Sequence, residues 1–263
     1  MKTVILIPAR YASTRYPGKP LAEIELPDGT RRSLIRLSWD AAQAVEGVSD
    51  VHVVTDDERI AEHVRGFGGD VIMTSETARN GTERCAEALT AGGIEADLIV
   101  NLQGDALLTP PWFIEDLMAA MERDAEAQVA TPVLRCDRTS YDHFREDRAA
   151  GRVGGTTAVM DAKGHALYFS KEVIPYIDPG KLPDPIPVFH HVGVYAYRPG
   201  TLAAYTGWAP GTLETLEGLE QLRFLENGTA VACVEVEGRG RVFWELNNPE
   251  DRPRIEAALR ELS

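Results

Sequence analysis

Residues 4–10 read Val4-Ile5-Leu6-Ile7-Pro8-Ala9-Arg10. The first four form a continuous apolar run rich in β-branched side chains, which is typical of a strand buried on both faces of a parallel sheet. A turn-rich basic segment follows and extends to Lys19-Pro20. Because ligands of open α/β sheets bind at the carboxyl ends of the strands, this stretch predicts an α/β fold with a binding site directly after its first strand.

Strands and helices alternate through the first half of the chain. Strands are expected at residues 51–55, 71–73, 98–102 and 129–134. Helices are expected at residues 33–45, 58–67, 82–90 and 110–123, the first with Ser33 as its N-cap. This alternation implies a three-layer, mostly parallel α/β sheet.

The pattern changes near Asp137. A β-hairpin is expected over residues 156–169, with Gly164 at its turn. The other expected elements are a Pro-rich loop at 175–187, strands at 192–197, 231–236 and 242–246, and helices at 212–226 and 249–262. Since no break in composition marks a linker, we expect a single domain, residues 1–263, whose later part is an insertion or subdomain on the same sheet.

The composition is that of an acidic globular protein. The 263 residues include 27 Lys+Arg and 41 Asp+Glu, for a net charge of −14, and 44% are hydrophobic, which excludes disorder as the main state. The acidic balance disfavours nucleic acid and anionic membranes as partners, because both require basic surfaces. The apolar run at the N-terminus is too short for a signal peptide or a membrane span. We therefore expect a cytoplasmic protein.

The segment after the first strand carries three cations, Arg10, Arg15 and Lys19, together with Ser13, Thr14 and Gly18. Arginine makes planar two-point contacts to phosphate and lysine supplies a point charge, so the segment suits an anion with several phosphates. The alternative is a solvated basic loop. Neither GxxxxGK[ST] nor GxGxxG occurs, which counts against a P-loop enzyme and a dinucleotide oxidoreductase.

A carboxylate follows the strand at 98–102, in the sequence Asn101-Leu102-Gln103-Gly104-Asp105. One or two carboxylates beside a polyphosphate are the usual protein ligands of Mg²⁺, so Asp105 is a candidate metal ligand. The alternative is an Asp that caps a turn, although the next helix starts at Pro110-Pro111. Gly81, at the start of a predicted helix, leaves N–H groups that suit an anion or a base edge, although a plain capped helix explains it equally well.

Other polar residues are expected to be structural. The pair His190-His191 has no further ligand at metal-binding spacing, so a hydrogen-bonded structural role is favoured. The isolated Cys85, Cys136 and Cys233 fit a reducing compartment rather than zinc or disulfides. Asp56 and Asp57 are also interpreted as structural. In the helix expected at 212–226, the leucines at 213, 216, 219 and 222 predict a core or interface stripe, and the carboxylates between them a solvated face.

Taken in order, these segments resemble the 3-deoxy-manno-octulosonate (Kdo) cytidylyltransferases, or CMP-Kdo synthetases. The resemblance spans the whole chain. It is carried by Ile7-Pro8-Ala9-Arg10-Tyr11-Ala12-Ser13-Thr14-Arg15-Tyr16-Pro17-Gly18-Lys19-Pro20-Leu21, Val53-Val54-Thr55-Asp56, Gly81-Thr82-Glu83-Arg84, Asn101-Leu102-Gln103-Gly104-Asp105, Ala166-Leu167-Tyr168-Phe169-Ser170, His191-Val192-Gly193-Val194-Tyr195-Ala196-Tyr197-Arg198, Leu219-Glu220-Gln221-Leu222-Arg223-Phe224-Leu225-Glu226-Asn227-Gly228 and Asn248-Pro249-Glu250-Asp251.

The resemblance implies a nucleotidyltransferase with a Rossmann-like, GT-A-like α/β fold, active as a homodimer. It implies transfer of CMP from CTP to the anomeric hydroxyl of Kdo with release of pyrophosphate, in the presence of Mg²⁺, for lipopolysaccharide or capsule synthesis. Residues 1–136 would mainly bind CTP, residues 137–228 would form a β-rich insertion for sugar binding and dimerisation, and residues 229–263 would return to the main sheet.

Carried over position by position, the resemblance also assigns site residues. The nucleotide set is Pro8, Ala9, Arg10, Ser13, Arg15, Lys19, Gly81, Thr82, Arg84 and Gln103. The sugar set is His191, Tyr195, Glu217, Glu220 and Gln221. Asp105 and Asn247 are the expected metal positions, and Arg10, Lys19 and Asp105 the expected catalytic residues.

The chain departs from the family pattern at four places. The usual Gly-Asp-Glu-Pro reads Gly104-Asp105-Ala106-Leu107, and the second Asp before the last helix is Asn247. Phe-Ser-Arg reads Phe169-Ser170-Lys171, and Ser-Gly-Thr-Asp reads Asn80-Gly81-Thr82-Glu83. These departures leave open whether one or two Mg²⁺ ions act and which sugar acid is used. The alternatives are activation of another 2-keto-3-deoxy sugar acid and a catalytically weak, nucleotide-binding paralogue.

Overall fold

The computed structural model describes residues 1–12, 16–104, 107–153, 155–178, 180–240, 246 and 249–261, with the backbone alone at 254 and 261. In the first half of the chain the predicted alternation is confirmed. The strands are β1 (Thr3–Ala9), β4 (Asp50–Thr55), β5 (Val71–Met73), β6 (Leu98–Leu102) and β7 (Val129–Arg135), and the helices are α1 (Leu34–Gln43), α2 (Glu58–Gly66), α3 (Gly81–Ala91) and α4 (Pro111–Arg123).

Local side chains explain where these helices start. The predicted N-cap Ser33 accepts a hydrogen bond from the N–H of Arg36, and Asp57 caps α2 through the N–H of Arg59. The side chain of Asn80 accepts from the N–H of Glu83 and so fixes the N-terminus of α3. Each cap satisfies an N–H group that the first turn of a helix leaves without a partner. Asp57 therefore has the structural role expected for it.

The structure also contains elements that the sequence did not predict. A short hairpin of β2 (Glu23–Glu25) and β3 (Arg31–Ser33) follows the 3-10 helix η1 (Lys19–Leu21), and helices α5 (Arg138–Ala149) and α6 (Pro199–Tyr205) are also new. The expected hairpin at 156–169 is confirmed. The remaining elements are β8 (Thr156–Met160), β9 (Ala166–Ser170), β10 (Phe189–His191), β11 (Val194–Tyr197), α7 (Thr212–Glu217), α8 (Leu222–Glu226), β12 (Val231–Glu235), the 3-10 helix η2 (Pro249–Asp251) and α9 (Arg252–Glu261).

The helix predicted over 212–226 is wrong as a single element. It ends at Gly218, which has φ of 62°, and resumes as α8. Glycine adopts this left-handed conformation without steric cost, so the chain turns between Glu217 and Leu222. The strand expected at 192–197 starts at Val194 and is preceded by the separate β10. The strand expected at 242–246 lies outside the described residues except for Leu246.

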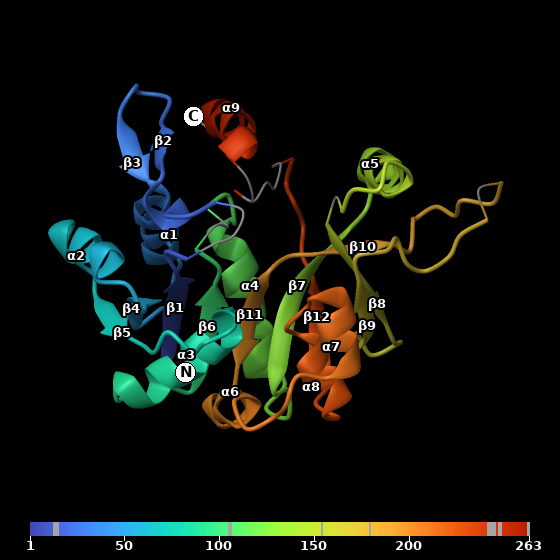
Figure 1. Cartoon of the computed structure of the whole chain (residues 1–263). Helices are drawn as coiled ribbons and strands as arrows, with labels where there is room; N and C mark the ends of the chain where they lie inside the picture. Colours follow the sequence, from blue (N-terminus) through green and yellow to red (C-terminus); the bar gives the residue numbers. More distant parts are fainter. Residues whose placement is uncertain are drawn as a thin grey trace.

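Ten of the described strands form one mixed sheet in the order β5-β4-β1-β6-β11-β7-β10-β8-β9, with β12 beside β7 (Figure 1). β5, β4, β1 and β6 are mutually parallel, as predicted, and β12 is parallel to β7. β11 runs antiparallel between β6 and β7. Strands β8 to β11 continue the same sheet, so the later residues extend it rather than build a separate one.

Helices cover both faces of this sheet (Figure 1). Ile5 and Ile7 pack in one core cluster with side chains of α1, α2 and α4. Val4 and Leu6 pack on the other face with side chains of α3, α6 and α8. The first strand is therefore buried on both faces, and the predicted three layers are present.

A third apolar cluster joins distant parts of the chain. Ile24 of β2, Leu34 of α1 and Ile255 of α9 pack with Leu107 and with Leu246. Helix α9 therefore packs against residues 107 and 108, which follow β6 in the chain. None of the helices in the part of the chain that the structure describes is long and apolar enough to cross a membrane.

Candidate functional site

Three residues of the predicted nucleotide set lie together at the carboxyl ends of β1 and β6. In the parallel ladder Leu6 lies opposite Asn101. Pro8 and Gln103, each two residues further on, therefore lie at the same edge of the sheet. A Cβ atom on Gly81 would lie 2.7 Å from Nε2 of Gln103 and 3.2 Å from Cγ of Pro8. The N-terminus of α3 therefore approaches these two strand ends as closely as only glycine permits.

The carboxylate of Glu220 links this group to the segment between α7 and α8. One oxygen accepts a hydrogen bond from the N–H of Thr82 at 3.1 Å, and the other accepts from Nε2 of Gln103 at 3.1 Å. Burial raises the pKa of Glu220, and the hydrogen bond from Thr82 opposes this shift. Glu220 thus brings one member of the predicted sugar set into contact with two members of the predicted nucleotide set.

The remaining nucleotide candidates on α3 point to other partners. The hydroxyl of Thr82 lies 3.0 Å from the hydroxyl of Tyr197. The buried Arg84 donates to Oγ1 of Thr74 at 2.7 Å and lies 3.2 Å from Oδ1 of Asp56. Asp56 is therefore structural, as expected, and the guanidinium of Arg84 is held at the ends of β4 and β5 rather than beside Gln103.

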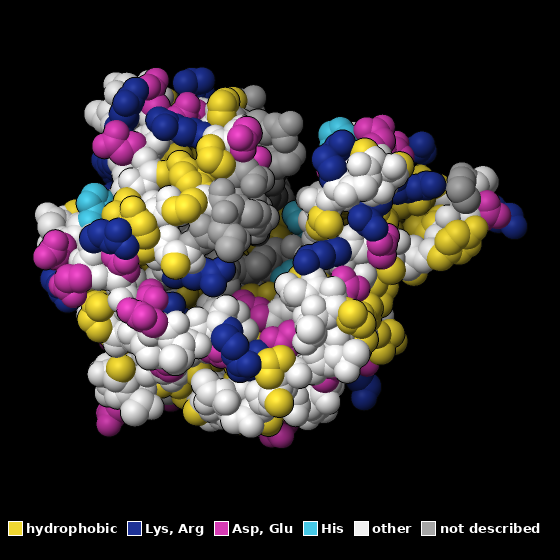
Figure 2. Space-filling view, in the orientation of Figure 1, with side chains coloured by type: hydrophobic (Ala, Val, Ile, Leu, Met, Phe, Trp, Pro, Cys, Tyr) yellow, Lys and Arg dark blue, Asp and Glu magenta, His cyan; other side chains and the backbone are white. Residues whose placement is uncertain are grey.

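The basic segment starts from the end of β1. Ala9 ends the strand, Arg10 follows it and is exposed, and Lys19 begins η1. Gly18, with φ of 70°, packs against the ring of Tyr11. Two further candidates in this segment, Ser13 and Arg15, lie outside the described residues. Figure 2 shows this face of the molecule hollowed between the part with β1 and α2 and the part with α5, with acidic and basic side chains together at the hollow.

The sugar candidates on α7 and β11 are hydrogen-bonded to other segments of the chain. Glu217 accepts hydrogen bonds from Oγ of Ser170 at 2.7 Å, from the N–H of Lys171 at 3.0 Å and from the hydroxyl of Tyr168 at 3.3 Å. The hydroxyl of Tyr195 donates to Oε1 of Gln221 at 3.2 Å. The expectation of a solvated acidic face on this helix is therefore wrong.

Two buried amides on this face lack partners. Nε2 of Gln221 has no hydrogen bond among the described residues, and neither has the side chain of Asn101, which lies opposite Tyr195 in the β6–β11 ladder. Unsatisfied buried polar groups are rare and call for an explanation. Asn101 belongs to the motif Asn101–Asp105, but a polar side chain inside a buried strand gives no signal of its own as a site residue.

His191 is a buried, hydrogen-bonded residue, as the sequence analysis favoured. Its Nε2 lies 3.0 Å from Oγ1 of Thr131, and its ring centroid lies 5.0 Å from that of Phe169. Burial, with a smaller contribution from His190, lowers its pKa to about 3. His191 is therefore neutral at physiological pH, and its predicted place in a sugar pocket remains a prediction.

Comparison with known proteins decides the family. Residues 4–235 match the family model described as cytidylyltransferase. The chain belongs to the cytidylyltransferase family. A relative from Maricaulis maris named 3-deoxy-manno-octulosonate cytidylyltransferase is 41% identical over 98% of this chain and 97% of its own. A relative from Shewanella piezotolerans named 8-amino-3,8-dideoxy-manno-octulosonate cytidylyltransferase is 39% identical, covering 98% and 99% of the two chains.

A solved structure supports the same assignment. CMP:2-keto-3-deoxy-manno-octonic acid synthetase complexed with CTP superposes with a TM-score of 0.85 and 32% identity over 100% of both chains. The resemblance to the CMP-Kdo synthetases and the α/β nucleotidyltransferase fold are thereby confirmed. The inserted subdomain and the roles of individual residues remain predictions.

The metal candidates of this cytidylyltransferase, Asp105 and Asn247, lie outside the described residues. Among the residues that the structure does describe, no group of three or more His, Cys, Asp or Glu could hold a metal ion. Their near neighbours Leu107 and Leu246 are buried in one apolar cluster. Leu107 and Leu246 are therefore brought together although they are far apart in the sequence.

Sequence reasoning missed a buried ionic network behind the site. Arg223, whose side chain is 1% exposed, donates to both carboxylate oxygens of Glu214 at 2.7 and 2.6 Å and to Glu83 at 2.9 Å. Burial would raise the pKa of Glu83, but hydrogen bonds from Arg79 and Arg223 lower it to about 2. The network fastens α7 and α8 to the first turn of α3, and so fixes Glu220 against Thr82.

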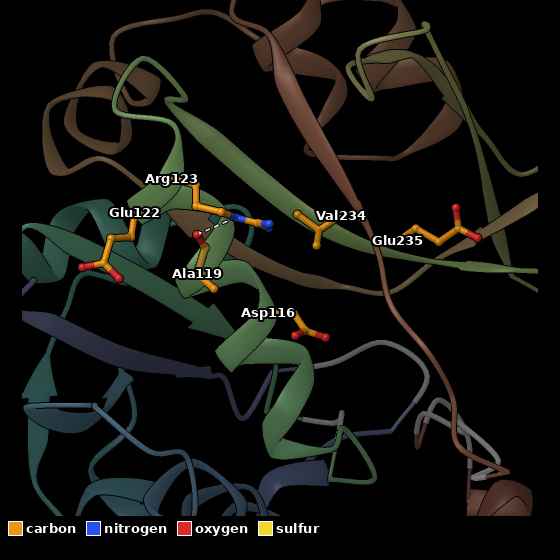
Figure 3. A pocket seen from close by; sticks show the side chains of 6 residues that line it. All are labelled: Asp116, Ala119, Glu122, Arg123, Val234 and Glu235. Atoms are coloured by element: carbon orange, nitrogen blue, oxygen red, sulfur yellow. Dashed lines mark hydrogen bonds between the residues drawn. The ribbon is translucent and has the colours of Figure 1, made fainter.

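A separate hollow of about 420 Å³ lies between α4 and β12. Figure 3 shows it lined by Asp116, Ala119, Glu122, Arg123, Val234 and Glu235, with Nε of Arg123 donating to the carbonyl of Ala119 at 3.2 Å. None of these residues belongs to the nucleotide or sugar set. We assign this hollow no part in the reaction.

We expect Gly81→Ala to lower kcat/KM for CTP by about 10- to 100-fold, because a displacement of about 1 Å in an active site can cost this much. The added methyl group would displace the amide of Gln103 or the ring of Pro8. Gly66→Ala is the matched control, because a Cβ there meets nothing within 4 Å. Equal rates for the two variants, measured as pyrophosphate release, would show that Gln103 does not contribute.

Proposed function

We propose that the protein transfers CMP from CTP to the anomeric hydroxyl of Kdo and releases pyrophosphate. The observation that supports this proposal is the contact of Glu220 with Thr82 and Gln103, which joins one residue of the predicted sugar set to two of the predicted nucleotide set. The sugar hydroxyl attacks the α-phosphorus, a bond forms between them, and the bond to the β-phosphate oxygen breaks. Such transfers depend mainly on positioning and charge neutralisation.

The basic segment holds the triphosphate. Arg10 and Lys19 lie at its two ends in the described part of the chain, and Ser13 and Arg15 complete the set by sequence. The positive charges of Arg10, Arg15 and Lys19 bind the β- and γ-phosphates, and they stabilise the negative charge that builds on pyrophosphate as it leaves. Gln103, Gly81 and Thr82 lie beside the cytidine, and Pro8 and Ala9 support the strand end.

Mg²⁺ is the proposed metal. The donor set of Asp105 and Asn247, one carboxylate and one amide oxygen, fits a hard cation that completes its shell with phosphate and water. The shared cluster of Leu107 and Leu246 supports a common location for the two segments. When bound, the ion would neutralise phosphate charge. A donor set with only one carboxylate suits one Mg²⁺ ion better than two ions.

The sugar set is His191, Tyr195, Glu217, Glu220 and Gln221. The unpartnered Nε2 of Gln221 is a donor suited to the carboxylate or a hydroxyl of the sugar acid. Glu217 accepts hydrogen bonds from three donors in residues 168–171, and these bonds fix the end of α7, four residues before Gln221. Kdo is the proposed sugar, and its 8-amino analogue is the competitor that the Shewanella relative suggests.

Pyrophosphate release tests this function. The protein is mixed with Mg²⁺, CTP or UTP, and Kdo, its 8-amino analogue or a nonulosonic acid. We expect release with CTP and Kdo together and none with CTP alone. Release with another sugar acid but not with Kdo would reassign the substrate, and tight CTP binding without release from any sugar would favour a nucleotide-binding paralogue.

We also propose that the enzyme acts in the cytoplasm as a homodimer and supplies activated sugar for lipopolysaccharide or capsule. Exposed apolar residues support the dimer. Leu216 of α7 is 79% exposed and Leu167 of β9 is 64% exposed. The bonds of Glu217 to residues 168–171 join these two elements. The predicted leucine stripe is thus partly a surface feature, which fits an interface.

Sedimentation velocity tests the dimer. We expect a dimer for the parent, and a dissociation constant raised about tenfold or more when Leu167 and Leu216 are both replaced by Asp, because buried apolar anchors dominate interfaces. Met73→Asp, at the opposite edge of the sheet on β5, is the control that should leave assembly unchanged. A monomeric parent would refute this arrangement.

A further inference from the structure

We propose that Glu220 is a positioning residue for base selection. By accepting a hydrogen bond from the amide nitrogen of Gln103, it turns the amide oxygen of Gln103 toward the nucleobase, so that the site takes cytosine and rejects uracil. The inference rests on the proposed function, in which Gln103 lies beside the cytidine. The proposal gives Glu220 a role in nucleotide specificity, although the residue belongs to the predicted sugar set.

The orientation of the Gln103 amide follows from the chemistry of its partner. A glutamine side chain has a donating nitrogen and an accepting oxygen, whereas an ionised carboxylate only accepts. The N–H of Thr82 on the other carboxylate oxygen favours the ionised form of Glu220, and the contact of 3.1 Å with Oε1 of the ionised carboxylate is made by Nε2 of Gln103. Oε1 of Gln103 receives no hydrogen bond from the described residues, so it is available to accept one from a ligand.

Glu220 is itself held in place on three sides. Its second carboxylate oxygen accepts the N–H of Thr82 in the first turn of α3, where the helix dipole favours negative charge. Its carbonyl oxygen accepts the hydroxyl of Tyr205 at 3.0 Å. Three residues further on, Arg223 is bound to Glu83 and Glu214. The backbone of Glu220 is thus fixed, and its carboxylate cannot turn away without breaking the bond to Thr82, so the amide of Gln103 stays in one orientation.

The nearness of Gly81 makes this orientation matter. The position of a Cβ on Gly81 would lie 2.7 Å from Nε2 and 3.2 Å from Oε1 of Gln103. The amide thus lies against the first residue of α3, with its nitrogen bonded to Glu220. A side chain in this position presents a single hydrogen-bonding group to a base held in a fixed register.

Cytosine and uracil differ at the group that such an oxygen would meet. Cytosine carries an amino donor at position 4, where uracil carries a carbonyl acceptor. Oε1 of Gln103 accepts from the amino group of cytosine but opposes the carbonyl of uracil, which leaves two acceptors unpaired. A glutamine free to rotate would serve both bases equally well, so the selection depends on Glu220.

The experiment compares kcat/KM for CTP and UTP, by pyrophosphate release with saturating Kdo, in the parent and in Glu220→Gln. In this isosteric variant the amide oxygen at position 220 accepts the N–H of Thr82, so the amide nitrogen faces Gln103 and no longer holds the oxygen of Gln103 toward the base. We expect the CTP-to-UTP ratio to fall by about 10-fold or more. The exchange of both residues, Gln103→Glu with Glu220→Gln, again presents an acceptor to the base and is expected to restore most of the preference.

Glu217→Gln is the matched comparison, because it removes a carboxylate of the same segment that accepts from Tyr168, Ser170 and Lys171 but not from Gln103. It is expected to leave the CTP-to-UTP ratio within about twofold of the parent. An unchanged ratio in Glu220→Gln, together with a raised KM for Kdo, would overturn the proposal and make Glu220 a sugar ligand only.

Calorimetric measurement of CTP and UTP binding tests the role of Glu220 in a variant that does not turn over. If Glu220→Gln is folded but inactive, an unchanged affinity ratio contradicts the proposal and a reduced ratio supports it. If the parent binds CTP in preference to UTP but does not turn over with Kdo, the proposed function is contradicted. The role of Glu220 is then decided by the ratio of the CTP and UTP affinities in Glu220→Gln. The two proposals can therefore fail separately.

Discussion

Asp105→Asn is expected to lower the rate of pyrophosphate release from CTP and Kdo by about 10²- to 10³-fold, the usual cost of removing one group that stabilises transition-state charge. The substitution keeps the shape of the side chain and removes the only carboxylate among the two proposed metal positions. The measurement is the initial rate at saturating substrates, with a Mg²⁺ titration of CTP binding to show that the metal affinity has fallen as well. Asp116→Asn, in the separate hollow of Figure 3, is the control and should retain the parent rate.

Asn247→Asp tests the second metal position. It is expected to retain at least the parent rate and to bind Mg²⁺ more tightly, because it adds a carboxylate to the set. Undiminished turnover in Asp105→Asn would contradict the proposed metal site. A parent that is inactive until Asn247 becomes Asp would show instead that the site in this chain has lost its function.

Arg223→Met is expected to lower the free energy of unfolding by about 3–5 kcal/mol, because removing one partner of a buried ion pair leaves uncompensated charge. Glu214 would lose its partner, and Glu83 would keep only Arg79. Methionine conserves most of the volume, so packing contributes little. Urea denaturation measures the effect.

The control for this variant is Arg148→Met, which breaks a surface pair with Glu172 and should cost no more than about 1 kcal/mol. The effect of Arg223→Met should also depend on pH. Because the pKa of Glu83 is lowered from 4.5 to about 2, this carboxylate stabilises the fold above pH 4.5, and its contribution is lost as the pH falls toward 2. A loss of stability no greater than that of Arg148→Met would show that the network is not energetically important.

The first half of the fold could be predicted because its pattern is local. The run at residues 4–7 is apolar throughout since both faces of β1 are covered, and Ser33 caps α1 through a contact within one turn. Helix α5 gave no such signal, because half of its residues are charged and it buries only Tyr141 and Phe144. Helix α6 has seven residues, too few for a helical period to be recognised.

The region around Gly218 shows why the site was only partly predictable. The leucine spacing at 213–222 favours one continuous helix, and nothing local indicates that the chain turns at Gly218. Spacing alone predicts that the carboxylates of Glu214, Glu217 and Glu220 face solvent, whereas the family resemblance assigns Glu217 and Glu220 to the sugar set. They are engaged because their partners come from distant segments, Arg223 beyond the turn, Ser170 of β9 and Thr82 of α3.

Resemblance to a family supplied what local patterns could not. It grouped Gly81 and Gln103 with Pro8, and the structure brings these three residues into contact. It also grouped Arg84 with them, but the structure directs this guanidinium to Asp56 and Thr74. Motif matching assigns a position along the chain, and the packing of each side chain then decides which group it meets.

Phosphorus NMR of the protein with CTP, Mg²⁺ and Kdo tests the central claim most directly, because it identifies both products. We predict that the CTP signals are replaced by those of pyrophosphate and of a phosphodiester between CMP and the sugar, and only when Kdo is present. Unchanged CTP signals in the presence of Kdo, or conversion of CTP to CDP and phosphate, would contradict it.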